Sequence, residues 1–190
     1  MTPQPLRIGT RGSPLALAQS NQVRDMLVAA YPNNPKPELH VIKTTGDQIT
    51  DRPLADLGGK GLFTKEIEQA LLDGAIDIAV HSMKDVETWL PDWLAVDCFI
   101  PREDPRDTLL GAASIGALPG GARVGTASLR RSAQLLAVRP DLTITLMRGN
   151  VGPRLDKLAA GEVDATLLAV AGLKRLGRAD AIGAVLEPAE

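Results

Sequence analysis

The spacing of apolar residues predicts alternating strands and helices in the first half of this 190-residue chain. Short apolar runs typical of buried strands lie at 6–9, 38–44, 76–80 and 94–100. A helix is predicted to start at Ser13-Pro14, because Ser caps helices well and Pro is tolerated in the first turn. A second helix is predicted from Phe63 to Gly74, where glycine ends the helical spacing.

The second half of the chain repeats this order of elements. Helices are predicted from Ser128, over 151–161 and through Leu173, and strands at 123–125, 142–147 and 163–170. Residues 70–77 and 158–164 both follow the order helix, Gly, one residue, aliphatic residue, Asp, strand. We therefore predict an α/β protein with two similar lobes, each a mixed sheet flanked by helices, and a ligand cleft between the lobes.

Composition shifts mark the predicted domain boundaries. The stretch 101–107 is charged, bounded by proline and free of apolar residues, so it is predicted to cross from a first lobe at 1–100 to a second lobe at 108–190. The segment 46–61 contains Gly and Asp with only isolated apolar residues. A loop of this length in a compact domain is typically functional, so we predict a mobile loop over the site.

Charge and cysteine content exclude several classes of protein. The net charge is -2, which argues against general affinity for nucleic acid. No run approaches the roughly 18 apolar residues of a membrane helix, and the N-terminus lacks the apolar core of a signal peptide, so we expect a cytoplasmic protein. The single cysteine, Cys98, allows no internal disulfide and is expected to be buried in the strand at 94–100. No spacing indicates a metal site.

Candidate chemistry is concentrated in polar segments at the ends of predicted strands. Arginine suits carboxylates and phosphates because it donates two parallel hydrogen bonds. Taken alone, Arg11 before Ser13 also fits a capped helix start with a solvated arginine. Lys84-Asp85 follows the strand at 76–80, where Asp85 can stabilise a cation or move a proton, and Lys84 can bind a carboxylate. A surface ion pair and, more weakly, a Schiff-base lysine remain alternatives for this pair.

The second lobe and the loop at 46–61 add further cations. Arg130 and Arg131 lie in the first turn of a predicted helix, where the helix dipole favours negative charge, and a bound anion would remove this conflict. Arg148 and Arg154 flank Gly149, which allows close approach of the backbone. Gly58-Gly59-Lys60-Gly61 lacks the spacing of a phosphate-binding loop and is better explained as a flexible lid with a cationic tip.

Taken together, these segments resemble the porphobilinogen deaminase (hydroxymethylbilane synthase) family of tetrapyrrole, or haem, biosynthesis. The matching strings run in family order across nearly the whole chain and are specific as a set: 11–17 (RGSPLAL), 58–63 (GGKGLF), 81–86 (HSMKDV), 102–107 (REDPRD), 126–131 (TASLRR), 148–151 (RGNV) and 168–176 (LAVAGLKRL).

The resemblance implies a transferase that joins four porphobilinogen molecules head to tail into hydroxymethylbilane, with loss of ammonia at each step. It implies that Asp85 faces the pyrrole nitrogens as the catalytic carboxylate. It also implies a lid carrying Lys60 and Phe63, and no nucleic-acid or membrane partner. The residues implied to bind the carboxylates of the substrate and of a dipyrromethane cofactor are Arg11, Ser13, Lys84, Thr126, Ser128, Arg130, Arg131, Arg148, Gly149 and Arg154.

The chain also departs from the family pattern. Relatives are expected to have a third domain with a cysteine that holds the dipyrromethane, and this sequence stops at Glu190; Cys98 is not assigned that role. Turnover by this chain alone is therefore in question. Glu87 and Thr88 follow Val86 where the family usually has proline, and Ala127 and Pro153 are smaller departures. We expect a monomer, and the alternative to an enzyme is a non-catalytic two-lobe module, of the type II periplasmic-binding kind, for a pyrrole or another small polycarboxylate.

Overall fold

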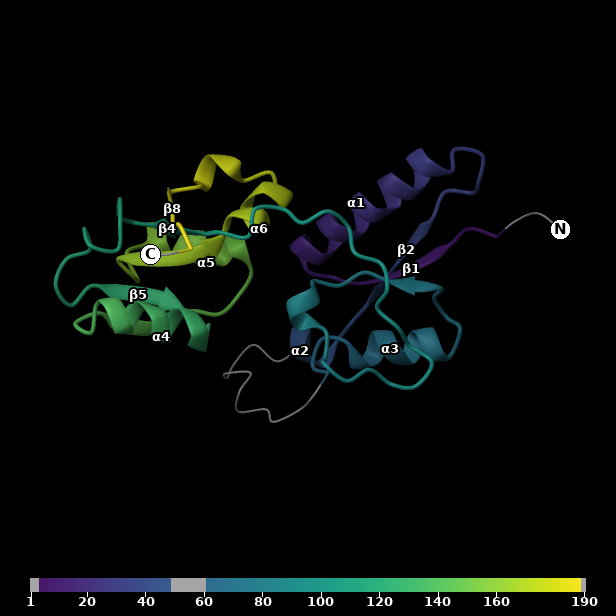
Figure 1. Cartoon of the computed structure of the whole chain (residues 1–190), viewed down its shortest axis with the longest axis horizontal. Coiled ribbons are helices and arrows are strands. Elements are labelled where there is room, and N and C mark those ends of the chain that lie inside the picture. Colours follow the sequence, from purple (N-terminus) through teal and green to yellow (C-terminus); the bar gives the residue numbers. More distant parts are fainter. Residues whose placement is uncertain (1–3, 49–60, 189–190) are drawn as a thin grey trace. The chain divides into compact units, whose positions relative to one another are not determined.

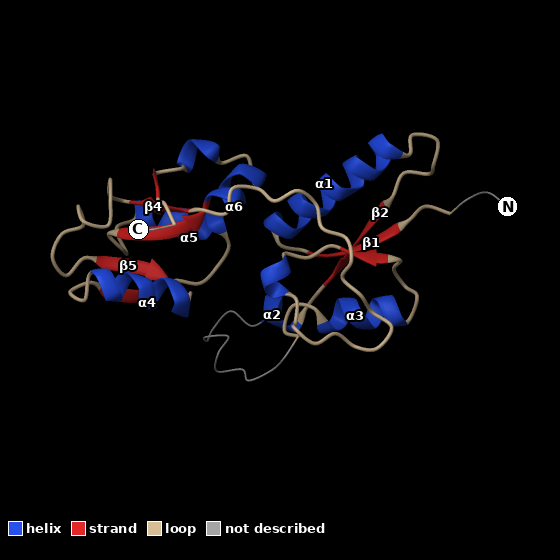
Figure 2. Ribbon diagram, in the orientation of Figure 1, coloured by secondary structure: helices blue, strands red, loops and turns tan. Residues whose placement is uncertain are grey.

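The structure is a computed structural model that describes residues 4–48 and 61–188. It consists of two compact units, Met1–Ile100 and Pro101–Glu190. Each unit contains its own sheet with helices packed beside it (Figures 1 and 2). The predicted α/β class is therefore confirmed, whereas the domain boundaries and the cleft expected between the lobes stay predictions.

In unit 1 the central strand of the sheet is β1, which ends at the candidate residue Arg11. The paired strands run in the order β2-β1-β3 and are all parallel, because helical crossovers connect them. The predicted cap is confirmed: the Ser13 side chain accepts a hydrogen bond from the Ala16 amide, and Pro14 begins the helix. The elements are β1 (Arg7–Arg11), α1 (Pro14–Ala30), β2 (Glu38–Ile42), α2 (Thr45–Gln48), α3 (Lys65–Leu72), β3 (Ile78–Ala79) and the short 3-10 helix η2 (Met83–Asp85).

Unit 2 has a larger, mixed sheet in the order β6-β5-β7-β4-β8. Strand β4 runs antiparallel to both β7 and β8, whereas β5 is parallel to β6 and β7. The elements are β4 (Asp107–Leu110), β5 (Arg123–Thr126), α4 (Leu129–Val138), β6 (Thr143–Leu146), α5 (Val151–Ala159), β7 (Ala165–Ala169), α6 (Val170–Arg175), the 3-10 helix η3 (Ala179–Ala181) and β8 (Ala184–Val185). The predicted mixed sheet is thus present in unit 2, whereas the described strands of unit 1 are wholly parallel.

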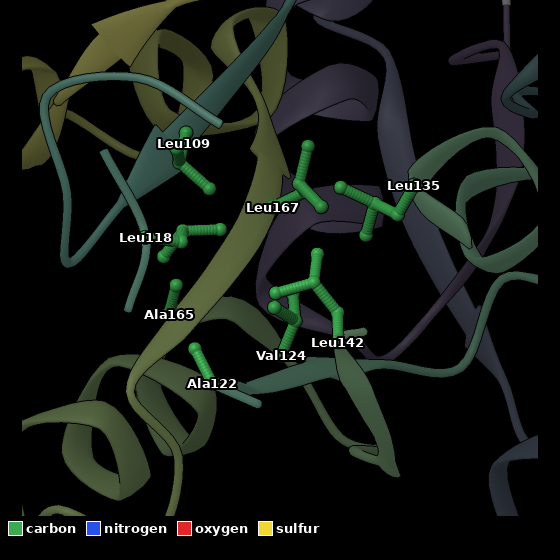
Figure 3. Packing of buried hydrophobic residues seen from close by; sticks show 8 residues of the cluster. All are labelled: Leu109, Leu118, Ala122, Val124, Leu135, Leu142, Ala165 and Leu167. Carbon is green, nitrogen blue, oxygen red and sulfur yellow. The ribbon is translucent and has the colours of Figure 1, made fainter. Parts of the chain in front are cut away.

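Side chains on both faces of the unit 2 sheet are buried. Consecutive residues of a strand point to opposite faces. Leu109 accordingly packs in a cluster with Leu135 of α4 (Figure 3), whereas Leu110 packs with Leu173 of α6. The eight side chains of the first cluster are turned toward one another in Figure 3, and they are all small or aliphatic. Packing on both faces holds the sheet in place, and with it the strand ends that carry the candidate residues.

Each unit contains the same arginine–aspartate connection at the start of one strand, β1 in unit 1 and β5 in unit 2. The Arg7 backbone amide donates to Asp77 Oδ2 at 2.8 Å, and its guanidinium binds the same carboxylate at 3.1 and 2.7 Å. Arg123 makes the same three bonds to Asp164, at 2.7, 3.2 and 2.9 Å. These aspartates are the ones in the repeated pattern of the sequence, so the repeat encodes a connection from β1 to the start of β3 in unit 1 and from β5 to the start of β7 in unit 2.

The predicted strand at 94–100 is wrong. This segment has no regular structure, and within the described residues its backbone pairs with no strand. A strand needs a hydrogen-bonded neighbour as well as an alternating pattern. Cys98 is consequently exposed, which also overturns its predicted burial. Of the loop predicted over 46–61, residues 46–48 belong to α2, and 49–60 lie outside the described residues.

Candidate functional site

The candidate residues of unit 1 meet at the C-terminal edge of its parallel sheet. Strand β1 ends at Arg11, and the chain leaving its parallel neighbour β3 forms the turn of 3-10 helix that contains Asp85. Because parallel strands end at the same edge, the two side chains are brought together, with Arg11 Nη1 3.8 Å from Asp85 Oδ2. They line a small pocket of about 40 Å³ together with Ser13, Gln19, His81 and Ser82.

Arg11 is held by groups on its other sides. Its Nε and Nη2 donate to the two oxygens of Asp47, at 3.2 and 2.5 Å. Its Cζ lies 3.9 Å above the centre of the Phe63 ring, within the range of a cation–π contact. Phe63 was predicted as part of a lid, and in the structure it supports the guanidinium. An added Cβ on Gly46 would lie 2.3 Å from this ring, so glycine is required for the ring to reach its place.

His81 was not predicted as a site residue, although it lines the same pocket. Burial lowers the pKa of His81, and the positive charge of Arg11 adds to this effect. The negative charges of Glu68 and Asp85 oppose the shift without reversing it. The imidazole is therefore uncharged at neutral pH, and among the described residues that line the pocket Arg11 and Asp85 carry the charges.

A second cluster occupies the C-terminal edge of β5 in unit 2. Thr126 ends β5 and is buried; its Oγ1 accepts a hydrogen bond from the Ser128 amide, and Ser128 in turn caps α4 through the Arg131 amide. Because β4 runs antiparallel to β7, it begins at the edge where β7 ends, with Asp107 opposite Ala169. This places a carboxylate beside the first turn of α4.

Asp107 binds the arginines that begin α4. Arg131 donates to its two oxygens at 2.8 and 2.7 Å, and also to the Leu167 carbonyl at 3.2 Å. Arg130 lies 3.7 Å from the same carboxylate and is exposed, with a hydrogen bond to Gln134. Asp107 therefore partly neutralises the two cations that were predicted to conflict with the helix dipole, so a ligand is not needed for the whole of this effect. Arg130 is the more accessible of the two.

The segment after β6 brings further positive charge. Gly149 has a φ of +109°, a conformation that glycine adopts without strain, and its carbonyl accepts a hydrogen bond from Arg154 Nε at 3.0 Å. Burial lowers the pKa of Arg154, and the nearby charge of Arg131 lowers it further. A half-buried cation beside another cation would be stabilised by an anion, which agrees with the predicted carboxylate site without testing it. Arg148 is half-buried at the end of the same strand.

The structure thus groups most predicted residues, unit by unit. Arg11, Ser13 and Asp85 share one pocket in unit 1, and Arg131 and Arg154 are electrostatically coupled in unit 2. Lys84 is exposed and is not among the residues that line the pocket, and Lys60 lies outside the described residues. The assignment of all these residues to a ligand stays a prediction. Four residues were missed: Gln19 and His81, which line the pocket, and Asp47 and Asp107, which bind Arg11 and Arg131.

A larger hollow of about 950 Å³ lies at the opposite, N-terminal end of β1. Its wall includes Tyr31 and the Arg7–Asp77 pair. That pair is mutually satisfied, whereas binding sites bring together polar groups that are available to a ligand. The smaller pocket beside Asp85 is therefore the better candidate for chemistry.

Within 4–48 and 61–188, no group of three or more His, Cys, Asp or Glu side chains is arranged to hold a metal ion. Across the same residues, none of the helices combines the length and apolar character needed to cross a membrane.

Comparisons with known proteins place this arrangement in context. A family model described as "Porphobilinogen deaminase, dipyromethane cofactor binding domain" matches residues 6–190. Porphobilinogen deaminase of Nitrobacter hamburgensis is 59% identical over 186 residues, which cover 96% of this chain and 59% of the relative. The chloroplastic porphobilinogen deaminase of Oryza sativa subsp. japonica is 58% identical over 186 residues, covering 95% and 52%. Among solved structures, the alkanesulfonate-binding protein SsuA from Xanthomonas axonopodis pv. citri bound to MOPS matches with a TM-score of 0.41 and 17% identity, covering 98% of this chain and 61% of that one.

The two curated relatives agree with the resemblance seen in the motifs. This chain spans 59% of the length of the Nitrobacter hamburgensis protein and 52% of the rice protein. The match to the family model runs through both sheets and includes every predicted site residue. The chain belongs to the porphobilinogen deaminase family.

Proposed function

We propose that the chain provides the substrate- and cofactor-binding part of a porphobilinogen deaminase. The observation that carries this proposal is the pocket in which Asp85 lies beside Arg11, at the edge of the sheet where α/β proteins bind ligands. Porphobilinogen bears two carboxylates and a positively charged aminomethyl group. A site for it therefore needs cations and one carboxylate, and both are present.

Each condensation breaks one C–N bond and forms one C–C bond. Ammonia leaves the aminomethyl carbon of one porphobilinogen, and that carbon joins the free α-carbon of the next pyrrole, which loses a proton. A cationic methylene-pyrrole forms between these steps. Asp85 stabilises this cation through its negative charge and can accept a proton from the pyrrole. Arg11 binds a substrate carboxylate and holds the ring beside Asp85.

The residues of unit 2 fit the dipyrromethane cofactor of the family. Arg154 is a partly desolvated cation beside Arg131, and such a pair favours a ligand with several carboxylates. Arg130, Arg148 and Ser128 would add donors to the same ligand. When bound, the dipyrromethane supplies the pyrrole carbon to which the first porphobilinogen is joined. The chain's own contribution is to neutralise and orient its carboxylates.

Porphobilinogen binding to the purified chain tests this proposal. Isothermal titration should show binding to the wild-type chain that weakens at least tenfold in Arg11→Met, because a charge-assisted pair is lost. Arg178→Met removes the same charge from an exposed side chain outside both clusters and should leave the affinity within about twofold. Equal weakening in both variants would show a non-specific effect of charge and would contradict the assignment of Arg11.

Incubation with porphobilinogen separates an enzyme from a binding module. Formation of hydroxymethylbilane, or a colour with an acidic aldehyde reagent from pyrrole that stays on the protein after denaturation, supports the deaminase. Binding without product or retained pyrrole favours the non-catalytic module. No binding at all contradicts both.

We further propose that the protein is monomeric and cytoplasmic. Its balanced charge of -2 supports a protein that neither binds nucleic acid nor adheres to acidic membranes. Light scattering after gel filtration tests the first part, since a dimer would elute with a mass of twice the 20.1 kDa of the chain.

A further inference from the structure

Arg11 has the freedom of a long side chain, yet the structure restrains its guanidinium on three sides. Asp47 accepts two hydrogen bonds from one edge, Phe63 covers one face, and the remaining Nη1 lies 3.8 Å from Asp85. Only 17% of the Arg11 side chain is exposed. The direction in which Arg11 can donate to a ligand is therefore set by its neighbours.

Asp47 is itself fixed. It lies in α2, and its Oδ2 accepts a hydrogen bond of 2.8 Å from the Thr44 hydroxyl. Thr44 is fully buried, and its carbonyl accepts the Asp47 amide at 3.1 Å, so both the side chain and the backbone of Asp47 are tied to the same residue. Burial alone would raise the pKa of Asp47, but the hydrogen bonds from Arg11 and Thr44 outweigh it and lower the pKa. The carboxylate stays charged at neutral pH.

We propose that Asp47 is a positioning residue that holds Arg11 with its Nη1 edge toward Asp85, so that a substrate carboxylate is bound at one fixed distance from the catalytic carboxylate. This inference rests on the proposed function of Arg11 and Asp85. It adds a residue that does not line the pocket and acts only through another side chain.

Two features of the geometry favour this role over simple stabilisation. A bidentate pair fixes the plane of a guanidinium, which a single contact does not. The pair also occupies Nε and Nη2, so that the edge facing Asp85 is the one left to serve a ligand in the pocket. Loss of Asp47 would remove the two hydrogen bonds that fix the plane of the guanidinium and would leave the Phe63 ring and the longer contact with Asp85 as the remaining restraints.

The same strand provides a matched control. Strand β1 begins at Arg7 and ends at Arg11, and each arginine makes a bidentate pair with an aspartate. Asp77→Asn removes the pair at the start of the strand, and Asp47→Asn removes the pair at its end. Both substitutions preserve side-chain shape and change one charge in unit 1, but only Asp47→Asn acts on the pocket.

The experiment first measures how tightly the Arg11 guanidinium is held and then how this affects ligand binding. In nitrogen-15 NMR spectra of the full 190-residue chain, the Arg11 side-chain signal is identified by its loss in Arg11→Lys. We expect a protected Nε–H and slow guanidinium rotation in the wild type and in Asp77→Asn. Asp47→Asn should raise the exchange rate of that proton at least tenfold, and Thr44→Val, which removes the hydroxyl but keeps the shape, should give a smaller increase.

Porphobilinogen titrations give the second readout. Asp47→Asn should weaken binding by roughly tenfold, and Asp77→Asn by less than about twofold. Both affinities are corrected for the fraction of each variant that is unfolded under the assay conditions. Unchanged Arg11 exchange in Asp47→Asn, or equal weakening in the two variants, overturns the proposal. If the wild-type chain does not bind porphobilinogen, the proposed function fails, whereas the NMR comparison still decides whether Asp47 positions Arg11.

Discussion

The pair between Asp107 and Arg131 should contribute more to stability than other Arg–Asp pairs of the same geometry. The Arg131 and Asp107 side chains are 14% and 18% exposed, and two hydrogen bonds of 2.8 and 2.7 Å join them. Removing one partner of a fully buried pair costs about 3–5 kcal/mol, and exposed pairs contribute about 0–1 kcal/mol. With partial hydration and the Leu167 carbonyl still available to Arg131, we expect Asp107→Asn to cost about 2 kcal/mol of unfolding free energy.

The Arg123–Asp164 pair in the same unit is the control. It has the same bidentate geometry, but its side chains are 47% and 41% exposed. Asp164→Asn should therefore cost less than Asp107→Asn. A double-mutant cycle with Arg131→Met should give a coupling energy of about 1–2 kcal/mol between Asp107 and Arg131.

The assay must report on unit 2 by itself. All five aromatic residues of the chain precede residue 101, so fluorescence does not follow the unfolding of unit 2. Hydrogen exchange with mass spectrometry, read from peptides of β4 and β7, gives the opening free energy of this sheet. If Asp107→Asn and Asp164→Asn lower it equally, or if the coupling energy is zero, burial does not set the strength of these pairs and the reasoning is refuted.

Three further predictions concern the framework of each unit. Gly111→Ala should destabilise unit 2 by more than about 2 kcal/mol in the same exchange assay, because Gly111 has a φ of +98° and an added Cβ would lie 2.2 Å from a backbone oxygen. The control, Gly120→Ala, places its Cβ in free space and should leave the stability nearly unchanged. Leu109→Ala should cost about 3–4 kcal/mol by leaving a cavity in the core; a cost below about 1 kcal/mol would contradict its burial. The Arg7 hydrogen bonds lower the pKa of Asp77 to about 2, so this pair stabilises unit 1 above about pH 4 and loses that effect as the pH falls toward 2. Acid unfolding of Asp77→Asn should therefore vary less with pH over that interval than acid unfolding of the wild type.

The sequence predicted the elements that local rules determine. Ser13 and Ser128 cap helices as expected, because a cap depends on residues within one turn. The repeated Gly-x-aliphatic-Asp pattern correctly indicated equivalent strands, and in the structure its aspartates, Asp77 and Asp164, bind the arginines that begin β1 and β5. The pattern at 94–100 failed because alternation does not reveal whether a neighbouring strand is present.

The residues that support the site could not be found in the same way. Asp107 was placed in the crossing between lobes, and its contact with Arg131 depends on the antiparallel direction of β4. Asp47 lay in a segment predicted as a loop, and its contact with Arg11 spans 36 residues of chain. Glu87 was noted only as a departure from the family pattern; in the structure its carboxylate accepts a hydrogen bond from the Gly61 amide. Each of these contacts follows from tertiary structure, which local patterns do not contain.

Backbone NMR during a porphobilinogen titration tests most directly whether the Arg11–Asp85 pocket of unit 1 and the arginine cluster of unit 2 bind the pyrrole carboxylates. We predict saturable shifts of amide signals at Ser13 and Asp85 in unit 1 and at Ser128, Arg131 and Arg154 in unit 2, and these shifts should become smaller as salt is raised. Shifts confined to the hollow beside Tyr31, or no shifts in either cluster at saturating ligand, would contradict this prediction.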